Sequence, residues 1–350
     1  MDDIDDDWEC FLQNDGTEYN SRNNLSKSHS NIPDKNNNEN ESMINNIDDS
    51  YVDKNGDSNN VSNIPKCSDL YISTKTKICY LNKKTIDVKK VFWDIPVIDY
   101  YVPTNGVIKK QTKFSSTSKD DVDYITEQLK NIEHYDEQII EHIDNPEGRI
   151  KYKDQRKISI GMCKKDILSY RSKKKRAFFN CFVVILRLFN DGIFKEIHIK
   201  VFNTGKLEIP GIQHDSLLHD VLELLVKTLK PYLGDDLVFM ADKSETVLIN
   251  SNFNCGFFID RDKFHDILKY KYRINSSFDS CSYPGIQCKF YYIPNAIEQT
   301  GAQPEVDVDH MEISFMVFRT GSVLIVGKCE EHVLKTIYNK LNIIMREEYA

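Results

Sequence analysis

Hydrophobic and polar residues alternate along several short stretches of the chain, which is typical of β-strands. This alternation, together with β-branched content, predicts strands over 69–81, 177–189, 193–202, 206–210, 246–259, 282–293, 311–318 and 322–326. Helical periodicity predicts helices over 82–92, 119–143, 214–233, 260–272 and 329–349. In 214–233 an apolar stripe recurs at helical spacing, with Asp215 as the expected N-cap and Pro231 as the expected end. Such one-sided helices must cover one face of a sheet.

Two eleven-residue stretches of the chain closely resemble each other. VFNTGKLEIPG ends at Gly211, and VFRTGSVLIVG ends at Gly327, so the offset between the two copies is 116 residues. The predicted elements around each stretch follow the same order: strand, helix, strand, strand, strand, helix. The sequence therefore predicts an α+β fold built from two repeats, with an antiparallel sheet and helices on one face. The opposite face carries apolar residues that no remaining element covers, which favours a binding surface.

Charge and composition divide the chain unevenly. Residues 1–66 contain 15 Asn, 15 acidic and 5 basic residues, a net charge of −10, whereas the remaining 284 residues have a net charge of +2. Such a segment buries too little apolar surface to fold, so we expect a disordered acidic tail over 1–66. We assign 67–93 and 177–233 to the first repeat, 94–176 to an insertion within it, and 234–350 to the second repeat.

Several classes of function find no support in the sequence. There is no secretory signal pattern and no apolar run of membrane-spanning length, so we expect an intracellular protein without a membrane partner. The nine cysteines form no CxxC pair, which favours free thiols and no metal site. A P-loop, an HExxH motif and a G-x-S-x-G motif are all missing from the sequence. We therefore expect no enzyme activity, no cofactor and no small-molecule substrate.

Five stretches, in this order along the chain, carry a resemblance to a known family. ISTKTKICYLNKKTI, FVVILRL, VFNTGK, SSFDSCSYPGI and VFRTGSVLIVG resemble the TATA-box-binding proteins, over roughly 69–92 and 177–349. The resemblance implies a pseudo-two-fold saddle, with helices on the convex face and a concave face that binds A·T-rich promoter DNA in the minor groove. Proteins of this family insert apolar wedges between base steps and kink the duplex, and are themselves an example of that mode. The long insertion and the Asn/Asp/Lys/Ile bias resemble a family member from a large DNA virus, or from another divergent lineage, more than an ordinary cellular one.

The resemblance also implies DNA-binding residues. It places aromatic wedges at Phe182, Phe202, Tyr283 and Phe318, and a base-reading amide at Asn250, with Asn252 as the alternative. It places apolar contacts on the groove floor at Ile72, Met316, Leu324 and Val326. It places phosphate contacts at Lys206, Arg187 and Lys289. The first half departs from the family pattern, because Leu70 replaces an amide and Lys200 and Glu208 replace apolar residues. Without the repeat, the phenylalanines would be read as core aromatics and Tyr283 as part of a simple turn.

Two functions follow as hypotheses. The first is a general transcription initiation factor that binds double-stranded A·T-rich DNA together with a transcription factor IIB-like protein and RNA polymerase. The resemblance implies that Asp279, Cys281 and Ser282 contact that protein partner. The alternative is a protein-interaction module that keeps the saddle and has lost sequence-specific DNA binding. The expected compartment is the nucleus for a cellular protein, and the virion or the cytoplasmic viral factory for a viral one.

Overall fold

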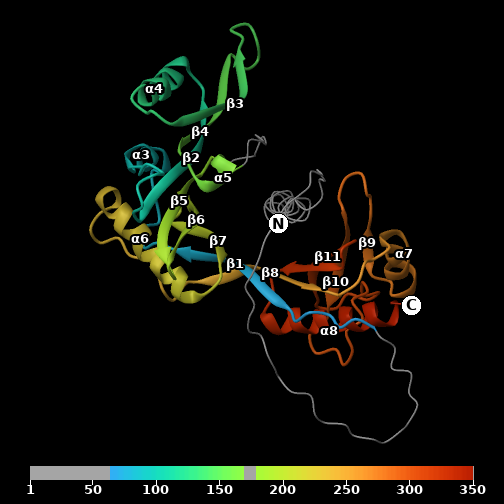
Figure 1. The fold of residues 1–350 in the computed structure, drawn as a ribbon. Helices are drawn as coiled ribbons and strands as arrows, with labels where there is room; N and C mark the ends of the chain where they lie inside the picture. The colour runs from blue at the N-terminus through green and yellow to red at the C-terminus, as the bar shows by residue number, and fades with distance from the viewer. Residues whose placement is uncertain (1–63, 169–178, 350) are drawn as a thin grey trace, which may run out of the picture. The chain divides into compact units, whose positions relative to one another are not determined.

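The structure, a computed structural model, describes residues 64–168 and 179–349 (Figure 1). Nearly all of the expected tail over 1–66 lies outside the described residues. The described residues form a single antiparallel sheet of 12 strands in the order β3-β4-β2-β5-β6-β7-β1-β8-β12-β11-β10-β9. The predicted α+β class, with an antiparallel sheet and an internal repeat, is confirmed.

The two repeats contribute matching halves of this sheet and meet at β1 and β8. The first contains β1 (Tyr71–Tyr80), α3 (Val88–Asp94), β2 (Gly106–Ser116), β5 (Cys181–Asn190), β6 (Ile193–Phe202), β7 (Lys206–Ile212) and α6 (Asp215–Leu233). The second contains β8 (Glu245–Asn254), α7 (Arg261–Asp266) with a π-helical continuation η1 (Ile267–Lys271), β9 (Asn275–Ser277), β10 (Gly285–Tyr292), β11 (Met311–Phe318), β12 (Ser322–Gly327) and α8 (Glu331–Glu347). The strand order β2-β5-β6-β7-β1 mirrors β9-β10-β11-β12-β8.

The stretch between β2 and β5 is more ordered than the sequence pattern indicates. It contains α4 (Lys119–Leu129), β3 (Tyr135–Asp144), β4 (Tyr152–Gly161) and α5 (Lys164–Leu168). The helix predicted over 119–143 is therefore wrong beyond Leu129, because 135–144 pairs with β4 as an edge strand. An edge strand with both faces largely exposed shows little hydrophobic alternation, so its sequence gives no strand signal. The assignment of 94–176 as a single insertion stays a prediction, although β2 is the counterpart of β9.

Some predicted helix ends also differ from the structure. His214 is the N-cap of α6, and Asp215 instead forms an ion pair with Lys77, with 3.1 Å between the charged atoms. Pro231 lies inside the last turn, and the helix continues to Leu233. The helix predicted over 82–92 begins only at Val88, because the Asp87 carboxylate caps it by accepting the Lys90 N–H.

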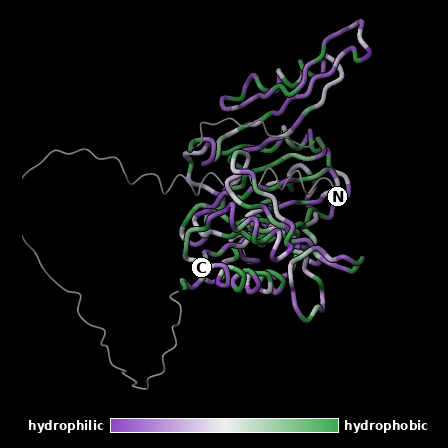
Figure 2. The backbone as a smooth tube through the Cα atoms, turned by 90° about the vertical axis from the view of Figure 1, so that its right-hand side faces the viewer, coloured by the Kyte–Doolittle hydropathy of each residue, from purple (hydrophilic) through white to green (hydrophobic). Residues whose placement is uncertain are grey.

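Two hydrophobic cores lie between the sheet and its helices, one in each repeat. Alternate strand residues point into them, among them Val184, Ile199 and Leu207 in the first repeat and Phe253, Ile313 and Ile325 in the second. The helices contribute their apolar stripes, and Figure 2 shows hydrophobic and hydrophilic residues following each other along α8 beside the C-terminal label. We call this side of the sheet the helix-covered face and the opposite side the open face.

Candidate nucleic-acid interface

Two rows of cross-strand neighbours cross the open face of the second repeat. One row consists of Tyr71, Asn252, Leu324 and Met316, and the next consists of Thr74, Asn250, Val326 and Ser314. The residues that alternate with them, such as Ile249 and Ile325, are buried against the helices. Because successive side chains of a strand point to opposite faces, both rows project from the open face.

An aromatic pair borders these rows at the ends of β10 and β11. The ring centroids of Tyr283 and Phe318 are 6.0 Å apart, and the Tyr283 hydroxyl donates to the Met316 sulfur at 3.6 Å. Gly285 lies beneath both rings, where a Cβ atom would come within 3.0 Å of Phe318 and 3.1 Å of Tyr283. The structure thus brings together the residues predicted for the second half: Tyr283, Phe318, Met316, Leu324, Val326, Asn250 and Asn252.

Asn250 is a buried amide with spare hydrogen-bonding capacity. Its side chain is 6% exposed in total, its Nδ2 donates to the Thr74 hydroxyl at 3.2 Å, and its Oδ1 has no partner among the described residues. A threonine hydroxyl can donate as well as accept, so the amide can turn over and still pair with Thr74. In that orientation the amide nitrogen takes the buried position of Oδ1 and has no partner there among the described residues.

The turn before Tyr283 is organised by Asp279. Its carboxylate accepts from the Cys281 N–H at 3.0 Å and from the Ser282 hydroxyl, and its carbonyl accepts from the Tyr283 N–H at 3.0 Å. These bonds, the one from the Ser282 hydroxyl foremost, lower the pKa of Asp279 below its ordinary value. Asp279, Cys281 and Ser282 therefore form the support of Tyr283, whereas their predicted contact with a protein partner stays a prediction.

The corresponding row of the first repeat is charged. In the second repeat, Leu324 pairs with Asn252 and Met316. The first-repeat counterpart of Leu324 is Glu208, which pairs with Ile78 and Lys200. The Lys200 Nζ lies 2.9 Å from the Glu208 carboxylate, and both side chains are largely buried. An ion pair thus replaces the apolar contact of Leu324 with Met316.

Phe182 does not lie on the open face. It is completely buried in the helix-covered core, so the prediction that it projects toward the groove is wrong. Cys181 pairs with Phe202 in the first repeat, and Gly285 pairs with Phe318 in the second, so Cys181 is the counterpart of Gly285. Phe179 precedes Cys181 by two residues, as Tyr283 precedes Gly285, and is therefore the counterpart of Tyr283. Phe179 is 39% exposed, with the Lys113 Nζ 3.9 Å from its ring centroid. The sequence concealed this register because FFNCFVVIL is apolar on both faces.

Ile72 also lies on the side opposite to the predicted one. The pairing register of β1 with β8 shifts after Ile72, which therefore packs against the helix-covered core. Tyr71, 58% exposed, takes the open-face position beside Asn252 and was missed from the sequence. Ile78 pairs with Glu208 as Asn252 pairs with Leu324, so Ile78 is the counterpart of Asn252. Two residues earlier on each strand, Thr76 is then the counterpart of Asn250, a position that the sequence had assigned to Leu70.

The predicted phosphate contacts have different environments. Arg187 is 5% exposed and donates to the backbone carbonyls of Tyr100, Val102 and Thr104, so the prediction that it reaches a phosphate is wrong. Lys206 lies near Phe202, which with Phe179 we call the first aromatic pair, and its Nζ is 5.5 Å from the Phe202 ring centroid. Lys289 is exposed and pairs with Glu312 at 2.8 Å.

Parts of the insertion cover the outer end of the first repeat's open face. Ile185 on β5 packs with Ile108, Cys163 and Tyr100, and is buried by them. The Lys109 Nζ donates to both carboxylate oxygens of Asp166 on α5 at 2.7 Å. These contacts cover part of the open face of β5, whereas Phe179 precedes the first residue of that strand. The two repeats therefore present different open faces.

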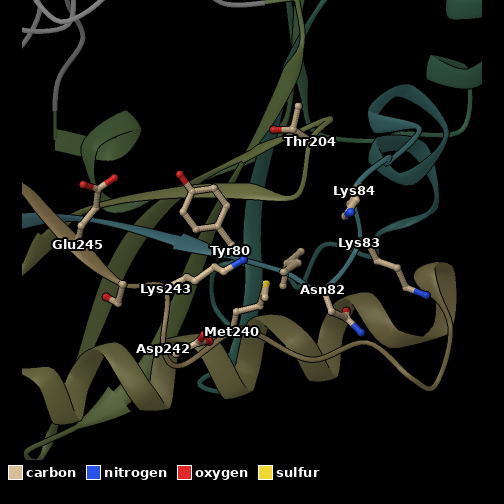
Figure 3. A pocket seen from close by; sticks show the side chains of 11 residues that line it. Tyr80, Asn82, Lys83, Lys84, Thr204, Met240, Asp242, Lys243 and Glu245 are labelled. Atoms are coloured by element: carbon tan, nitrogen blue, oxygen red, sulfur yellow. The ribbon is translucent and has the colours of Figure 1, made fainter.

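A hollow of about 620 Å³ lies where β1 ends, close to the turn between β6 and β7 and the segment before β8 (Figure 3). Its lining mixes lysines with carboxylates, including Lys84, Lys243, Asp242 and Glu245, so no single charge dominates it. Within the described residues, no cluster of three or more metal-ligating side chains occurs. No helix among them is long and apolar enough to cross a membrane.

Comparisons with known proteins find two similar proteins. No family model matches the chain. A TATA-box-binding protein-like protein of Acanthamoeba polyphaga mimivirus is 26% identical over 192 residues, covering 49% of this chain and 50% of the relative. The chain therefore matches about half the length of that relative. Among solved structures, Methanococcus jannaschii TBP aligns with 11% identity and a TM-score of 0.38, over 80% of this chain and 99% of that one.

The structural likeness is weak, so the fold assignment rests on the strand pairing and the internal repeat. The fold and its open face define a two-repeat α+β protein with an antiparallel sheet. The sequence match adds a similarity to a viral TATA-box-binding protein-like protein.

Proposed function

We propose that this chain binds A·T-rich duplex DNA through the minor groove and acts in transcription initiation. The observation that carries the proposal is the second repeat's open face, where Tyr283 and Phe318 border an apolar floor with the amide of Asn250 at its edge. Apolar wedges of this kind unstack base steps, and an amide donor matches the acceptors that A·T pairs offer in the minor groove.

Wedge and floor have separate roles in this proposal. The two rings would enter between bases, which costs a few kcal/mol of stacking that contacts elsewhere must offset. Leu324, which is partly exposed, would supply such a contact to the sugar edges of the groove, and the buried side chains of Met316 and Val326 lie on the same face. A promoter-bound complex of this kind would be recognised by a transcription factor IIB-like protein and RNA polymerase, as the family resemblance implies.

The test compares affinities for short A·T-rich and G·C-rich duplexes at one salt concentration. Tyr283→Ala should weaken binding to the A·T-rich duplex by about ten-fold, because stacking of a base on an aromatic ring contributes about 1–3 kcal/mol. Tyr270→Ala, on the exposed surface of η1, is the matched control and should bind as the unaltered chain does.

The same experiment distinguishes the second candidate, a protein-interaction module without DNA binding. The covered outer end of the first repeat and its Lys200–Glu208 pair favour that function, since both reduce the apolar surface available to a groove. An unaltered chain that bound neither duplex would support the interaction module and overturn the proposal.

A further inference from the structure

Strand β2 of the first repeat and strand β4 beyond it carry lysines on the open face. Lys113 on β2 and Lys157 on β4 are direct cross-strand neighbours, and Lys153 lies further along β4 on the same face. Their sequence neighbours Phe114 and Ile158 are buried in the helix-covered core, so alternation directs the lysines to the open face. We call Lys113, Lys153 and Lys157 the lysine strip.

The lysine strip carries three positive charges on one face. The Glu141 carboxylate beside it lies 2.8 Å from the Lys153 Nζ. Gln155 separates Lys153 from Lys157 on β4. Lys113 and Lys157 are direct cross-strand neighbours, where like charges are destabilising, so an anion beside both would reduce their repulsion. The pKa of Lys113 lies below its ordinary value, mainly because of burial; the charge of Glu141 raises this pKa and that of Lys153 lowers it. A bound anion would raise the pKa of Lys113.

The position of the strip connects it to the aromatic residues. The Lys113 Nζ lies over the Phe179 ring, and Phe179 precedes the strand residue that pairs with Phe202. The strand order β4-β2-β5 therefore places the strip on the outer side of the first aromatic pair. In the sheet that the described residues form, the second repeat ends at the three-residue strand β9, with no strand beyond it.

We propose that the lysine strip binds the phosphate backbone of duplex DNA just beyond the segment held by the open face. This inference rests on the proposed function and extends it, because the insertion would lengthen the contact on one side only. Lysine acts as a point charge, so the strip contributes affinity and orientation rather than base preference. A contact present in one repeat also makes the two ends of the bound duplex unequal, which gives the complex a direction.

The test uses the full chain with two A·T-rich duplexes, one with short flanks and one with long flanks. Lys113→Gln combined with Lys157→Gln should make the salt dependence of log K for the long duplex shallower by about 1.8, since each phosphate contact contributes about 0.9. The control combines Lys227→Gln with Lys335→Gln, on the exposed surfaces of α6 and α8, and should leave that slope unchanged.

The outcomes separate this inference from the proposed function. An unchanged slope for the strip variant, with weaker binding by Tyr283→Ala, would overturn the strip and leave the proposed function standing. An equal change on both duplexes would also overturn it, because the lysines would then contact the central segment. A chain that bound neither duplex would overturn both proposals. A slope change confined to the long duplex is the expected result.

Discussion

Glu208 and Lys200 occupy the positions that Leu324 and Met316 occupy in the other repeat. Their ion pair of 2.9 Å keeps the Glu208 carboxylate from facing a phosphate field alone. A partly buried ion pair still has to be desolvated, and replacing such a pair with apolar residues is often neutral or stabilising. At the residue scale, these two side chains give the first repeat a charged row where the second repeat has an apolar one.

Exchanging this ion pair tests its role. Lys200→Met combined with Glu208→Leu should strengthen A·T-rich binding by about ten-fold, or roughly 1.4 kcal/mol, because it restores an apolar row like that of the second repeat. The measurement is affinity at fixed salt, together with the free energy of unfolding, which should change little. Exchange of the Lys340–Glu298 pair in the same manner, at α8, serves as the control. Weaker binding by the Lys200 and Glu208 variant would contradict the prediction.

At the scale of elements, the turn from Asp279 to Gly285 positions an aromatic side chain through hydrogen bonds. Asp279→Ala removes the acceptors of the Cys281 N–H and the Ser282 hydroxyl, so Tyr283 should lose its fixed position. We expect several-fold weaker A·T-rich binding with an unchanged unfolding midpoint, since such exposed turn bonds contribute little to stability.

Asp279→Asn separates this role from a charge-dependent contact with a protein partner. The asparagine side chain keeps an acceptor for the turn, so DNA binding should return to nearly the unaltered affinity. If the asparagine variant bound DNA as weakly as the alanine variant, the positioning role of the hydrogen bonds would be wrong.

The junction of α3 with β2 contains a buried lysine. The Lys110 Nζ donates to the carbonyls of Trp93 and Ile95, and burial lowers the pKa of Lys110 to about 8. Between pH 8 and about 10.5 the unfolded chain holds this proton and the folded chain does not, so stability rises with pH across that window. The rise corresponds to about 3 kcal/mol if no other group interferes.

Unfolding free energies of the unaltered chain and Lys110→Met, compared between pH 7.5 and about 9.5, test this prediction, because the buried cysteines, whose pKa burial raises, lower the stability of both chains alike there. The unaltered chain should gain stability relative to Lys110→Met as the pH rises across that range. Lys227→Met, at an exposed site on α6, is the control and should keep it. A Lys110→Met variant that gained stability in parallel with the unaltered chain would assign the pH dependence to other groups.

At the scale of the whole molecule, unequal repeats should bind DNA unequally. Phe318 has Tyr283 and Met316 as neighbours, whereas Phe202 lies beside Lys206 and close to the charged row. We therefore expect Phe318→Ala to weaken A·T-rich binding by about ten-fold, the loss of one stacked ring, and Phe202→Ala by less than about three-fold.

Affinities of both variants at one salt concentration decide the matter. Circular dichroism should first show that each variant keeps the fold, since both rings are only partly exposed. Equal losses in the two variants would show that the repeats contribute alike, and the charged row would then have no effect on binding.

Much of this fold was readable in the sequence. The 116-residue offset between the FNTG and FRTG turns established two repeats, period-two alternation located β6, and the repeat order together with apolar runs located β11 and β12 to within a residue. These signals are local, because one face of each strand is buried and the other is not. The second repeat's set of Tyr283, Phe318, Asn250, Leu324 and Val326 followed from the same pattern together with the family resemblance.

Tertiary structure alone decided the first repeat's open face. In β5 every position is apolar or covered, so only pairing with β6 showed that Phe182 points to the helices and that Phe179 replaces it. Contacts between segments far apart in the chain also determine the register shift after Ile72. Such contacts likewise bring the backbone carbonyls that accept hydrogen bonds from Arg187. The sequence determined which residues alternate, whereas long-range pairing determined which face each of them reaches, because a one-residue shift of register reverses every side chain of a strand.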